Sequence, residues 1–350
     1  MKPKRISVHS KNKKLICLAL QGGGAYGAFT WGILDRILED ERLEIDAISA
    51  TSAGSINAVV MADGICQGGN EQARINLNNF WIALSQYGAA FSPLRQNPWE
   101  AFFGTNFTEQ ISFFIFEAIS RVFSPYVLNP FNFNPLRLLL LQKINFSKLQ
   151  EESKIKLFLC ATNIKTGRLK IFENSELTPD TVLASACLPN LYQAVKVDKN
   201  YYWDGGFVGN PAIFPLIYNS QVEDIIILHT NPIDRMNIPI SAQDMANRIN
   251  EISFNSSLLR ELRAIAFVTK LIDDGCIKTE YQYKISKKFT HLIRSDEMMK
   301  TFTLLNKYNW HWDFLFHLHK LGRISAESWL NKHFRDIGKR STIDFNEFLS

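Results

Sequence analysis

A serine that could act as a nucleophile lies at the centre of the sequence Ala50-Thr-Ser-Ala-Gly54. The order small residue, any residue, serine, any residue, glycine is typical of a nucleophile elbow when it joins a strand to a helix. In such a turn Ser52 is held in a strained conformation, with its Oγ above the sheet and the positive end of the next helix beside it. Taken alone, Ser52 is more simply interpreted as a helix N-cap, a position where serine is common.

A glycine-rich loop precedes this serine and has the sequence Gly22-Gly-Gly-Ala-Tyr-Gly27. Beside an elbow, the backbone N–H groups of such a loop can bind the oxyanion of an acyl-transfer reaction, and loss of one donor typically raises the barrier by about 2.7–4 kcal/mol. Glycines fit this role because side chains would block the approach of an ester carbonyl. The oxyanion-hole donors that we expect are Gly22, Gly23, Gly24 and Ala53.

The same loop matches GxGxxG, the pattern of a dinucleotide-binding loop, and it lies between a predicted strand and a predicted helix. Asp46 lies near the distance along the chain expected of an acid that binds the ribose. A lone GxGxxG is weak evidence, however, and the second predicted strand ends in the elbow rather than in an acid. A dinucleotide-binding Rossmann protein therefore stays an alternative to a hydrolase.

A base for the serine is supplied by Asp204, in the sequence Tyr201-Tyr-Trp-Asp-Gly-Gly-Phe207. The two glycines that follow Asp204 allow the chain to turn tightly beside the elbow. Taken alone, the motif is more simply interpreted as an Asp-Gly-Gly turn between strands. His229 ends a predicted strand and follows Asp204 in the chain, so a Ser–Asp–His triad in the order seen in α/β-hydrolases is a further alternative.

Together, the glycine loop, the elbow and the Asp-Gly-Gly motif resemble the patatin-like phospholipase family in their order and spacing. A fourth block, Ala184-Ser-Ala-Cys-Leu-Pro189, is similar to the segment that precedes the aspartate in that family. The resemblance covers about residues 14–231, and the ending from Gly322 to Asp344 is similar to the tail of a bacterial subgroup. Two positions depart from the pattern: Ala50 stands where the family usually has glycine, and Tyr26 where many members carry arginine or lysine.

The resemblance implies a lipid acyl hydrolase of phospholipase A or lysophospholipase type, with Ser52 as nucleophile and Asp204 as proton acceptor. It implies a lipid or phospholipid substrate and a reaction without histidine, metal or cofactor. A catalytically weak or inactive lipid-binding module is an alternative, motivated by Ala50 and Tyr26. The residues expected to support the motifs are Gly27, Ala50, Gly54, Gly205 and Gly206.

Alternating strands and helices are predicted to position these motifs. Apolar runs indicate strands, and apolar residues at helical spacing indicate helices, the last of them interrupted at Gly322. We expect strands over 15–20, 45–50, 156–162, 169–172 and 225–229, and helices over 28–39, 52–62, 67–84, 179–187, 241–273 and 310–337. This order predicts a three-layer α/β/α fold of the patatin-like kind, with a central mixed, mostly parallel sheet and a helical C-terminal extension.

The chain divides into three predicted regions. They are a basic arm at 1–13, a catalytic domain at 14–231 and the helical extension at 232–350. Within the catalytic domain, residues 88–135 are rich in phenylalanine and predict a lid or insert beside the site, although core packing is the simpler interpretation. The basic arm favours contact with anionic lipid heads, or else is a solvated tail.

Composition limits the remaining possibilities. The chain has 350 residues, 46% of them hydrophobic, with a net charge of +5 and five cysteines in no CxxC pair. We expect buried free thiols and no disulfide. Histidines in the tail lack an acid cluster, so no metal site is expected. Without a signal peptide or a membrane span, the expected location is cytoplasmic or peripheral to a membrane. Signal-independent export stays open, no nucleic-acid binding is expected, and no protein partner is indicated.

Overall fold

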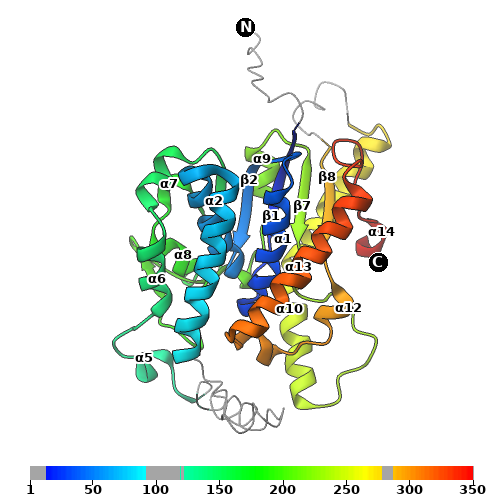
Figure 1. Ribbon diagram of the computed structural model, residues 1–350. Helices are drawn as coiled ribbons and strands as arrows, with labels where there is room; N and C mark the ends of the chain where they lie inside the picture. The colour runs from blue at the N-terminus through cyan, green and yellow to red at the C-terminus, as the bar shows by residue number, and fades with distance from the viewer. Residues whose placement is uncertain (1–12, 92–118, 120–121, 278–286, 350) are drawn as a thin grey trace.

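A mixed, mostly parallel sheet forms the centre of the protein (Figure 1). The computed structural model describes residues 13–91, 119, 122–277 and 287–349, so residues 1–12 of the predicted basic arm and most of the predicted lid lie outside the described residues. The strands are β1 (Lys14–Leu20), β2 (Leu43–Thr51), β3 (Lys156–Asn163), β4 (Leu169–Glu173), β5 (Val195–Val197), β6 (Asn200–Asp204), β7 (Asp224–Leu228) and β8 (Phe289–Ile293). The predicted strands over 15–20, 45–50, 156–162, 169–172 and 225–229 are therefore confirmed to within a few residues.

The strand order among the described residues is β5-β6-β3-β2-β1-β7-β8, with β4 also paired to β3. Strands β3, β2, β1, β7 and β8 run parallel to one another. Strands β4 and β6 are antiparallel to β3, and β5 is antiparallel to β6. The sheet is thus mixed and mostly parallel, as the sequence predicts.

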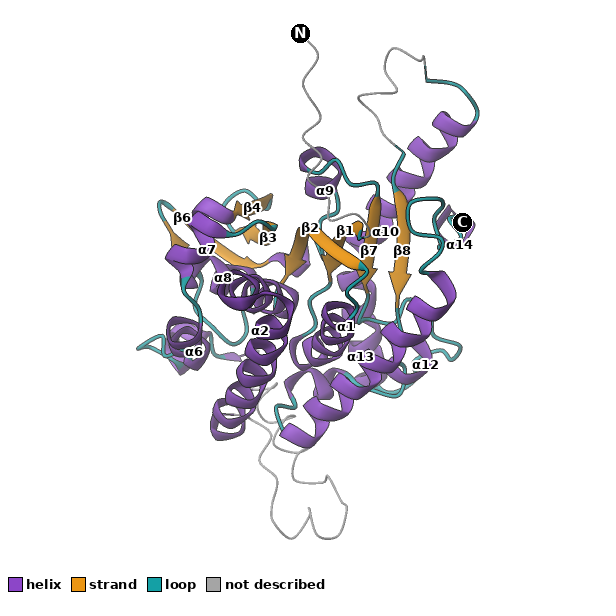
Figure 2. Ribbon diagram, turned by 45° about the horizontal axis from the view of Figure 1, so that its top comes forward, coloured by secondary structure: helices purple, strands orange, loops and turns teal. Residues whose placement is uncertain are grey.

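Helices cover both faces of the sheet (Figure 2). Along β1, Ile16, Leu18 and Leu20 face a core shared with α1 (Gly27–Glu39), α2 (Ala53–Phe91) and α13 (Trp312–His333). The alternate residues Cys17 and Ala19 face a second core shared with α9 (Phe214–Asn219) and α10 (Ala242–Asp273). This two-sided burial is what a continuous apolar run indicates in a parallel strand. The predicted α/β/α layers are therefore present.

Short helices connect these layers. They are α5 (Pro125–Leu128), α6 (Pro135–Lys143), α7 (Phe146–Glu152), α8 (Pro179–Ser185), α12 (Asp296–Met299) and α14 (Asn346–Leu349), with single 3₁₀ turns at η1 (Gly24–Tyr26), η2 (Asn174–Glu176), η3 (Gly205–Phe207) and η4 (Leu304–Tyr308). Local signals start the helices: Thr178 and Thr181 form a capping box before α8, and Ser241 Oγ accepts the Asp244 N–H before α10. Among the described helices, none is long and apolar enough to cross a bilayer.

Helix α2 contains both helices predicted after the elbow. Its backbone leaves the helical region at Gly68 and Gly69, so the segment is two helices joined at a kink. Gly69 has a φ of 79°, a left-handed conformation that glycine adopts without steric cost. Two helices are therefore present, but the predicted gap at 63–66 is wrong: that stretch is helical, and the chain breaks at this glycine pair instead.

Residues 232–350 are mostly helical, as predicted, and they also complete the sheet. Strand β8 pairs in parallel with β7, from Phe289 opposite Asp224 to Ile293 opposite Leu228. Helix α13 lies along α1 on one face of the sheet (Figure 1). This part of the chain is thus built into the layers that contain the predicted site.

The predicted break at Gly322 is wrong, because α13 continues through it from Trp312 to His333. The glycine serves a close helix crossing instead. A Cβ atom on Gly322 would lie 2.1 Å from the Phe29 carbonyl oxygen, and one on Gly32 would lie 2.0 Å from the His319 carbonyl oxygen. Two glycines facing each other thus allow the backbones of α1 and α13 to touch.

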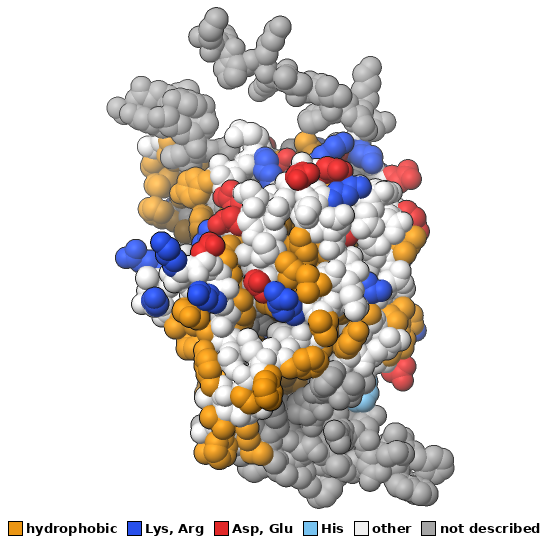
Figure 3. Space-filling view, turned by 90° about the vertical axis from the view of Figure 1, so that its left-hand side faces the viewer, with side chains coloured by type: hydrophobic (Ala, Val, Ile, Leu, Met, Phe, Trp, Pro, Cys, Tyr) orange, Lys and Arg blue, Asp and Glu red, His pale blue; other side chains and the backbone are white. Residues whose placement is uncertain are grey.

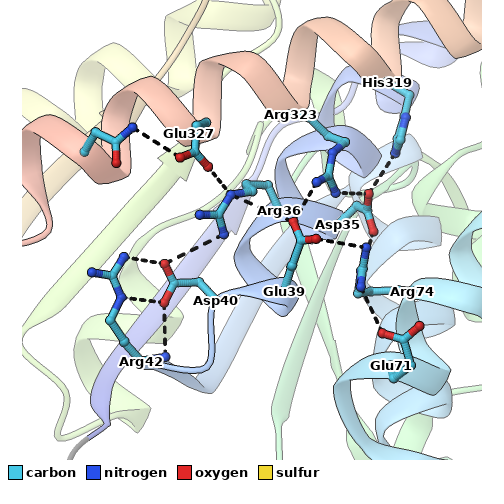
Figure 4. A network of polar contacts seen from close by, with 11 residues as sticks. Asp35, Arg36, Glu39, Asp40, Arg42, Glu71, Arg74, His319, Arg323 and Glu327 are labelled. Atoms are coloured by element: carbon cyan, nitrogen blue, oxygen red, sulfur yellow. Dashed lines mark hydrogen bonds and ion pairs between the residues drawn. The ribbon is translucent and has the colours of Figure 1, made fainter.

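Ion pairs extend this helix contact toward solvent (Figure 4). Asp35 of α1 accepts hydrogen bonds from Arg74 Nε at 2.7 Å, from His319 Nε2 at 3.2 Å and from Arg323. Burial alone would raise the pKa of this carboxyl, but these donors together hold it well below its usual range. Arg323 also donates to Glu39 at 2.6 Å, so the network joins α1, α2 and α13.

The five cysteines are all free. Cys17, Cys160 and Cys187 are buried, as predicted. Cys66 is half-buried and Cys276 is exposed, so the expectation of burial is wrong for these two.

The crossing of α1 and α13 makes a prediction about Gly322→Ala. Helix propensity alone favours alanine by about 1 kcal/mol. Because the new Cβ would meet the Phe29 carbonyl, we expect a net loss of about 1–3 kcal/mol in the free energy of unfolding, measured by urea denaturation. The control is Ser328→Ala on the exposed side of α13, which should change stability little. A more stable Gly322→Ala protein would contradict the close crossing.

Candidate active site

Ser52 occupies the turn between β2 and α2, where a nucleophile elbow places its serine. Its φ is 56°, a left-handed conformation that is strained for a residue with a side chain. The Ser52 N–H donates to Ser185 Oγ at 3.0 Å, and Ser55 Oγ lies 2.8 Å from the same atom. Ser185 is the last residue of α8, so the Ala-Ser-Ala-Cys-Leu-Pro block contacts the elbow through this side chain.

Asp204 reaches this turn through the pairing of β3. Thr51, the last residue of β2, is opposite Cys160, and Asp204 is opposite the next residue, Ala161. Strand β4 occupies the other edge of β3 over the same stretch. Strands β2 and β6 must therefore lie end to end along one edge of β3. Their meeting ends carry Ser52 and Asp204.

The Asp204 carboxyl is completely buried. Its Oδ1 accepts the Gly206 N–H at 2.7 Å. Burial raises the pKa of Asp204 to about 6, against the lowering effects of the Ser52 hydroxyl, the Gly206 N–H and the charge of Lys307. The hydroxyl is thus close enough to affect the carboxyl, although Oδ2 has no partner of full hydrogen-bond geometry in the described part of the chain. Such loose contacts are usual in sites without substrate.

Gly22 is held on both sides of its backbone. Its N–H donates to Asn210 Oδ1 at 2.8 Å, and its C=O accepts from Asn231 Nδ2 at 3.0 Å. A Cβ at this position would lie 2.6 Å from that of Ser52, so the glycine touches the elbow. Because the Gly22 N–H already donates to Asn210, it is not free to bind an oxyanion. Three of the four predicted oxyanion donors remain.

The other three predicted donors are differently placed. Within the described residues, the N–H groups of Gly23, Gly24 and Ala53 make no hydrogen bond to a protein acceptor. Gly24 begins η1 with a φ of 60°, and Ala53 begins α2. A Cβ on Gly27 would lie 2.7 Å from that of Ala53, so the glycine loop packs directly against the elbow.

Buried amides fix the glycine loop to the sheet. Gln21 Oε1 accepts the N–H groups of Thr230 and Asn231 at 2.9 and 3.0 Å. Gln21 Nε2 donates to Asn255 Oδ1 at 2.9 Å. Sequence reasoning missed this amide set and Asn210. Only the position of Gln21 next to the glycines and of Asn231 after β7 could have pointed to it.

His229 belongs to this amide network rather than to a triad. Its Nε2 lies 3.0 Å from Asn255 Oδ1, and it forms no hydrogen bond with Ser52 or Asp204 in the described residues. Burial lowers the pKa of His229 below its usual range, so the ring is neutral at pH 7. The alternative of a Ser–Asp–His triad is therefore not supported by the geometry.

Asp46 does not reach the glycine loop. It lies where the register of β1 on β2 skips one residue, near the beginning of β2, whereas the loop lies at the end of β1. Its carboxylate accepts hydrogen bonds from Ser220 Oγ at 2.7 Å and Lys156 Nζ at 3.4 Å. The dinucleotide-binding alternative thus lacks its ribose-binding acid.

The remaining motif positions are close-packed. Ala50 is fully buried in the core on the α2 side of the sheet, so its methyl group is accommodated. A Cβ on Gly54 would lie 2.5 Å from the Leu20 carbonyl oxygen, and one on Gly205 would lie 2.2 Å from that of Cys160. Among the described residues, no group of three or more His, Cys, Asp or Glu side chains is placed to hold a metal ion.

Comparison with known proteins agrees with the sequence motifs. The model of the family described as Patatin-like phospholipase matches residues 18–217, more than half of the chain. None of the curated proteins compared with the chain matches it.

Two solved structures are distantly similar. VipD from Legionella pneumophila has 14% identity and a TM-score of 0.41, with 94% of this chain and 72% of that chain covered. ExoU, in its complex with SpcU from the type III secretion system of Pseudomonas aeruginosa, has 16% identity and a TM-score of 0.37. That match covers 93% of this chain but only 52% of the other, so this chain spans about half of ExoU.

The buried carboxyl makes a prediction about stability and pH. Because the pKa of Asp204 is raised to about 6 in the native state, the native protein binds this proton more tightly than the unfolded chain does. Stability is therefore lost as the pH rises from about 4 through about 6. We expect Asp204→Asn to be about 1–3 kcal/mol more stable than wild type at pH 7.5, with the gain vanishing near pH 4.

Urea denaturation across this pH range measures the effect. Asp198→Asn, on the exposed turn between β5 and β6, controls for the substitution itself and should change stability little at pH 7.5. Equal stability of wild type and Asp204→Asn at both pH values would contradict the raised pKa.

Proposed function

Since the chain belongs to the patatin-like phospholipase family, we propose that it is a lipid acyl hydrolase of phospholipase A or lysophospholipase type that uses Ser52 and Asp204. The observation that carries the proposal is the end-to-end placement of β2 and β6 along β3. This placement supports pairing Ser52, a serine with a positive φ, with the buried carboxyl of Asp204. The glycine loop packed on the elbow supports the same chemistry.

In the proposed mechanism Asp204 takes the proton from Ser52 Oγ as that oxygen attacks the ester carbonyl. The N–H groups of Gly23, Gly24 and Ala53 stabilise the negative charge on the carbonyl oxygen. Asp204 then gives the proton to the leaving alcohol, which leaves an acyl group on Ser52. Water then attacks the acyl carbonyl while Asp204 takes its proton, and Asp204 returns that proton to Ser52 Oγ as the acyl–serine bond breaks and the fatty acid leaves. A carboxyl whose pKa is about 6 is well matched to this double role near neutral pH.

The two departures from the family pattern do not remove any of these groups. Ala50 is accommodated in the core. The Tyr26 hydroxyl is not available to bind an anion, because it donates to the Thr303 carbonyl at 2.6 Å. A lipid-binding module without activity stays the alternative that the next experiment separates from an enzyme.

Ser52→Ala is expected to abolish ester hydrolysis, with at least a thousandfold loss in kcat, because the nucleophile is removed. Turnover of a nitrophenyl ester measures the loss, and product analysis on mixed phospholipids and lysophospholipids identifies the substrate class. Ser328→Ala on exposed α13 is the control and should keep full activity. Ester turnover that survives Ser52→Ala would remove the assignment of this serine, and a wild type without turnover would favour the binding module.

We further propose that the enzyme approaches lipid with an apolar rim around the site. Large apolar side chains are exposed in two segments, beside α5 and before α10, with Phe131 and Met236 each 94% exposed. Figure 1 shows α5 and the start of α10 at the same end of the molecule, toward which β1 and β2 run. Figure 3 shows hydrophobic side chains gathered along the lower part of the described surface on one side of the molecule. We define the apolar rim by Phe123, Val127, Phe131, Met236, Ile238 and Ile240.

The residue that follows the basic arm lies away from this rim. Lys14, which follows the arm, begins β1, and Ser52 follows the end of the parallel strand β2. Lys14 thus lies at the opposite end of these parallel strands from the candidate site. Exposed apolar patches such as the apolar rim mark contact surfaces in soluble proteins.

Substitution of Phe131 and Ile238 by Asp is expected to weaken binding to phosphatidylcholine vesicles by roughly tenfold or more, because each buried apolar side chain contributes about 1.5–3 kcal/mol. Turnover of a soluble short-chain ester should be unchanged. Vesicle flotation and ester assays measure the two effects. The matched control is Ile324→Asp on α13, an exposed apolar position outside the rim. Equal losses of vesicle binding and soluble-ester turnover would argue against a separate docking surface.

A further inference from the structure

A buried lysine lies beside the glycine loop. Lys307 of η4 donates through Nζ to Asn231 Oδ1 and to Asn250 Oδ1, both at 2.6 Å. The same ammonium lies 4.8 Å from the ring centre of Phe254 and 5.6 Å from that of Tyr26. A buried charge of this kind is energetically costly, so its presence calls for a physical reason.

No direct ion pair compensates this charge within the described residues. The acids whose charges act on Lys307 are Glu251 and Asp204. Glu251 is already paired with Arg235 at 2.5 Å and with Arg248 at 3.2 Å. The net effect of the surroundings is desolvation, which lowers the pKa of Lys307 to about 8. Lys307 is therefore still mostly protonated at pH 7.

The backbone of η4 also touches the glycine loop. A Cβ on Gly24 would lie 2.5 Å from the Lys307 carbonyl oxygen. The Tyr26 hydroxyl donates to the Thr303 carbonyl at 2.6 Å, and the Leu304 N–H donates to Asn247 Oδ1 at 2.7 Å. These contacts fix the height of η4 over the loop, and with it the position of the ammonium.

A chain of hydrogen bonds leads from the ammonium to the peptide between Gly22 and Gly23. Lys307 donates to Asn231 Oδ1, and Asn231 Nδ2 donates to the Gly22 carbonyl at 3.0 Å. That carbonyl belongs to the same peptide group as the Gly23 N–H. Hydrogen bonds in such chains polarise one another, and the effect is larger when the first donor is charged. Polarisation at the carbonyl makes the N–H at the other side of the peptide a stronger donor.

We propose that Lys307 is a positioning residue of the oxyanion hole, which acts through Asn231 on the Gly22–Gly23 peptide so that the Gly23 N–H binds the developing oxyanion more strongly. This role rests on the proposed function of Ser52, Asp204 and the glycine loop. The charge of Lys307 also favours the ionised form of Asp204, since the two groups interact. One cation thus supports the base and the oxyanion donor together.

The expected pH profile of kcat/KM has two limbs. Activity rises through about pH 6 as Asp204 loses its proton, and it falls through about pH 8 as Lys307 loses its own. The other titratable groups that face Lys307 are Tyr26 and Glu251. Burial raises the pKa of Tyr26 far above its usual range, so this phenol stays neutral. Glu251 is ion-paired with two arginines.

Lys307→Met tests the proposal with a soluble ester as substrate. We expect kcat to fall about tenfold or more with little change in KM, the fall above pH 8 to disappear, and the limb near pH 6 to move upward by roughly half a unit or more. Lys307→Gln keeps a neutral donor toward Asn231 and should recover part of kcat without restoring the alkaline limb.

Lys288→Met is the matched control, because Lys288 is also buried but donates to the Ser220 and Val222 carbonyls at 3.1 and 2.8 Å. It should lose stability and keep both limbs.

A lower kcat with both limbs unchanged in Lys307→Met would overturn the proposal, as would a wild-type profile that does not fall above pH 8. Should Lys307→Met fail to fold, judged by its melting curve, Lys307→Gln and the wild-type profile decide. Labelling of Ser52 with an alkyl fluorophosphonate separates this inference from the proposed function. A wild type that neither hydrolyses esters nor takes the label would overturn both, whereas an active wild type with unaltered limbs in the lysine variants would overturn this inference alone.

Discussion

The edge of β3 that carries two strands end to end is the constraint on which the site depends. Strand β2 is parallel to β3 and ends at Thr51, and β6 is antiparallel to β3 and ends at Asp204. These two end residues lie opposite adjacent residues of β3. A shift of one residue in either pairing would turn the side chains at its end to the other face of the sheet. The burial of alternate faces of these strands by two separate cores therefore also fixes the distance between nucleophile and base.

The candidate site contains three groups that are unfavourable where they lie. Ser52 has a positive φ, Asp204 is a buried acid and Lys307 is a buried cation, and each of these lowers stability on its own. The surrounding structure offsets them with well-satisfied contacts. The amides of Gln21, Asn231 and Asn255 hold the glycine loop, and the crossing of α1 and α13 at facing glycines adds packing away from the chemistry.

Local patterns predicted the central elements because their signals lie within a few residues. The apolar run before Gly22, the small residues around Ser52 and the Asp-Gly-Gly turn each specify their own backbone. Contacts between distant segments carry no such signal. The close crossing at Gly322 resembled a helix break in the sequence, strand β8 lay in a segment expected to be helical, and Lys307 was one lysine among many. The engagement of the Gly22 N–H by Asn210 was likewise invisible, because 188 residues separate them.

The seating of η4 on the glycine loop has a consequence for the order in which the chain is made. Gly24 and Lys307 are separated by 283 residues (307 minus 24). At about 5–20 residues per second, roughly 15–55 seconds of synthesis lie between them. During that interval the growing chain carries the serine elbow and the glycine loop, and later the aspartate, without the segment that seats the loop. The site can thus be completed only after η4 has been made, and a transcript cut short before η4 would encode the family motifs without it.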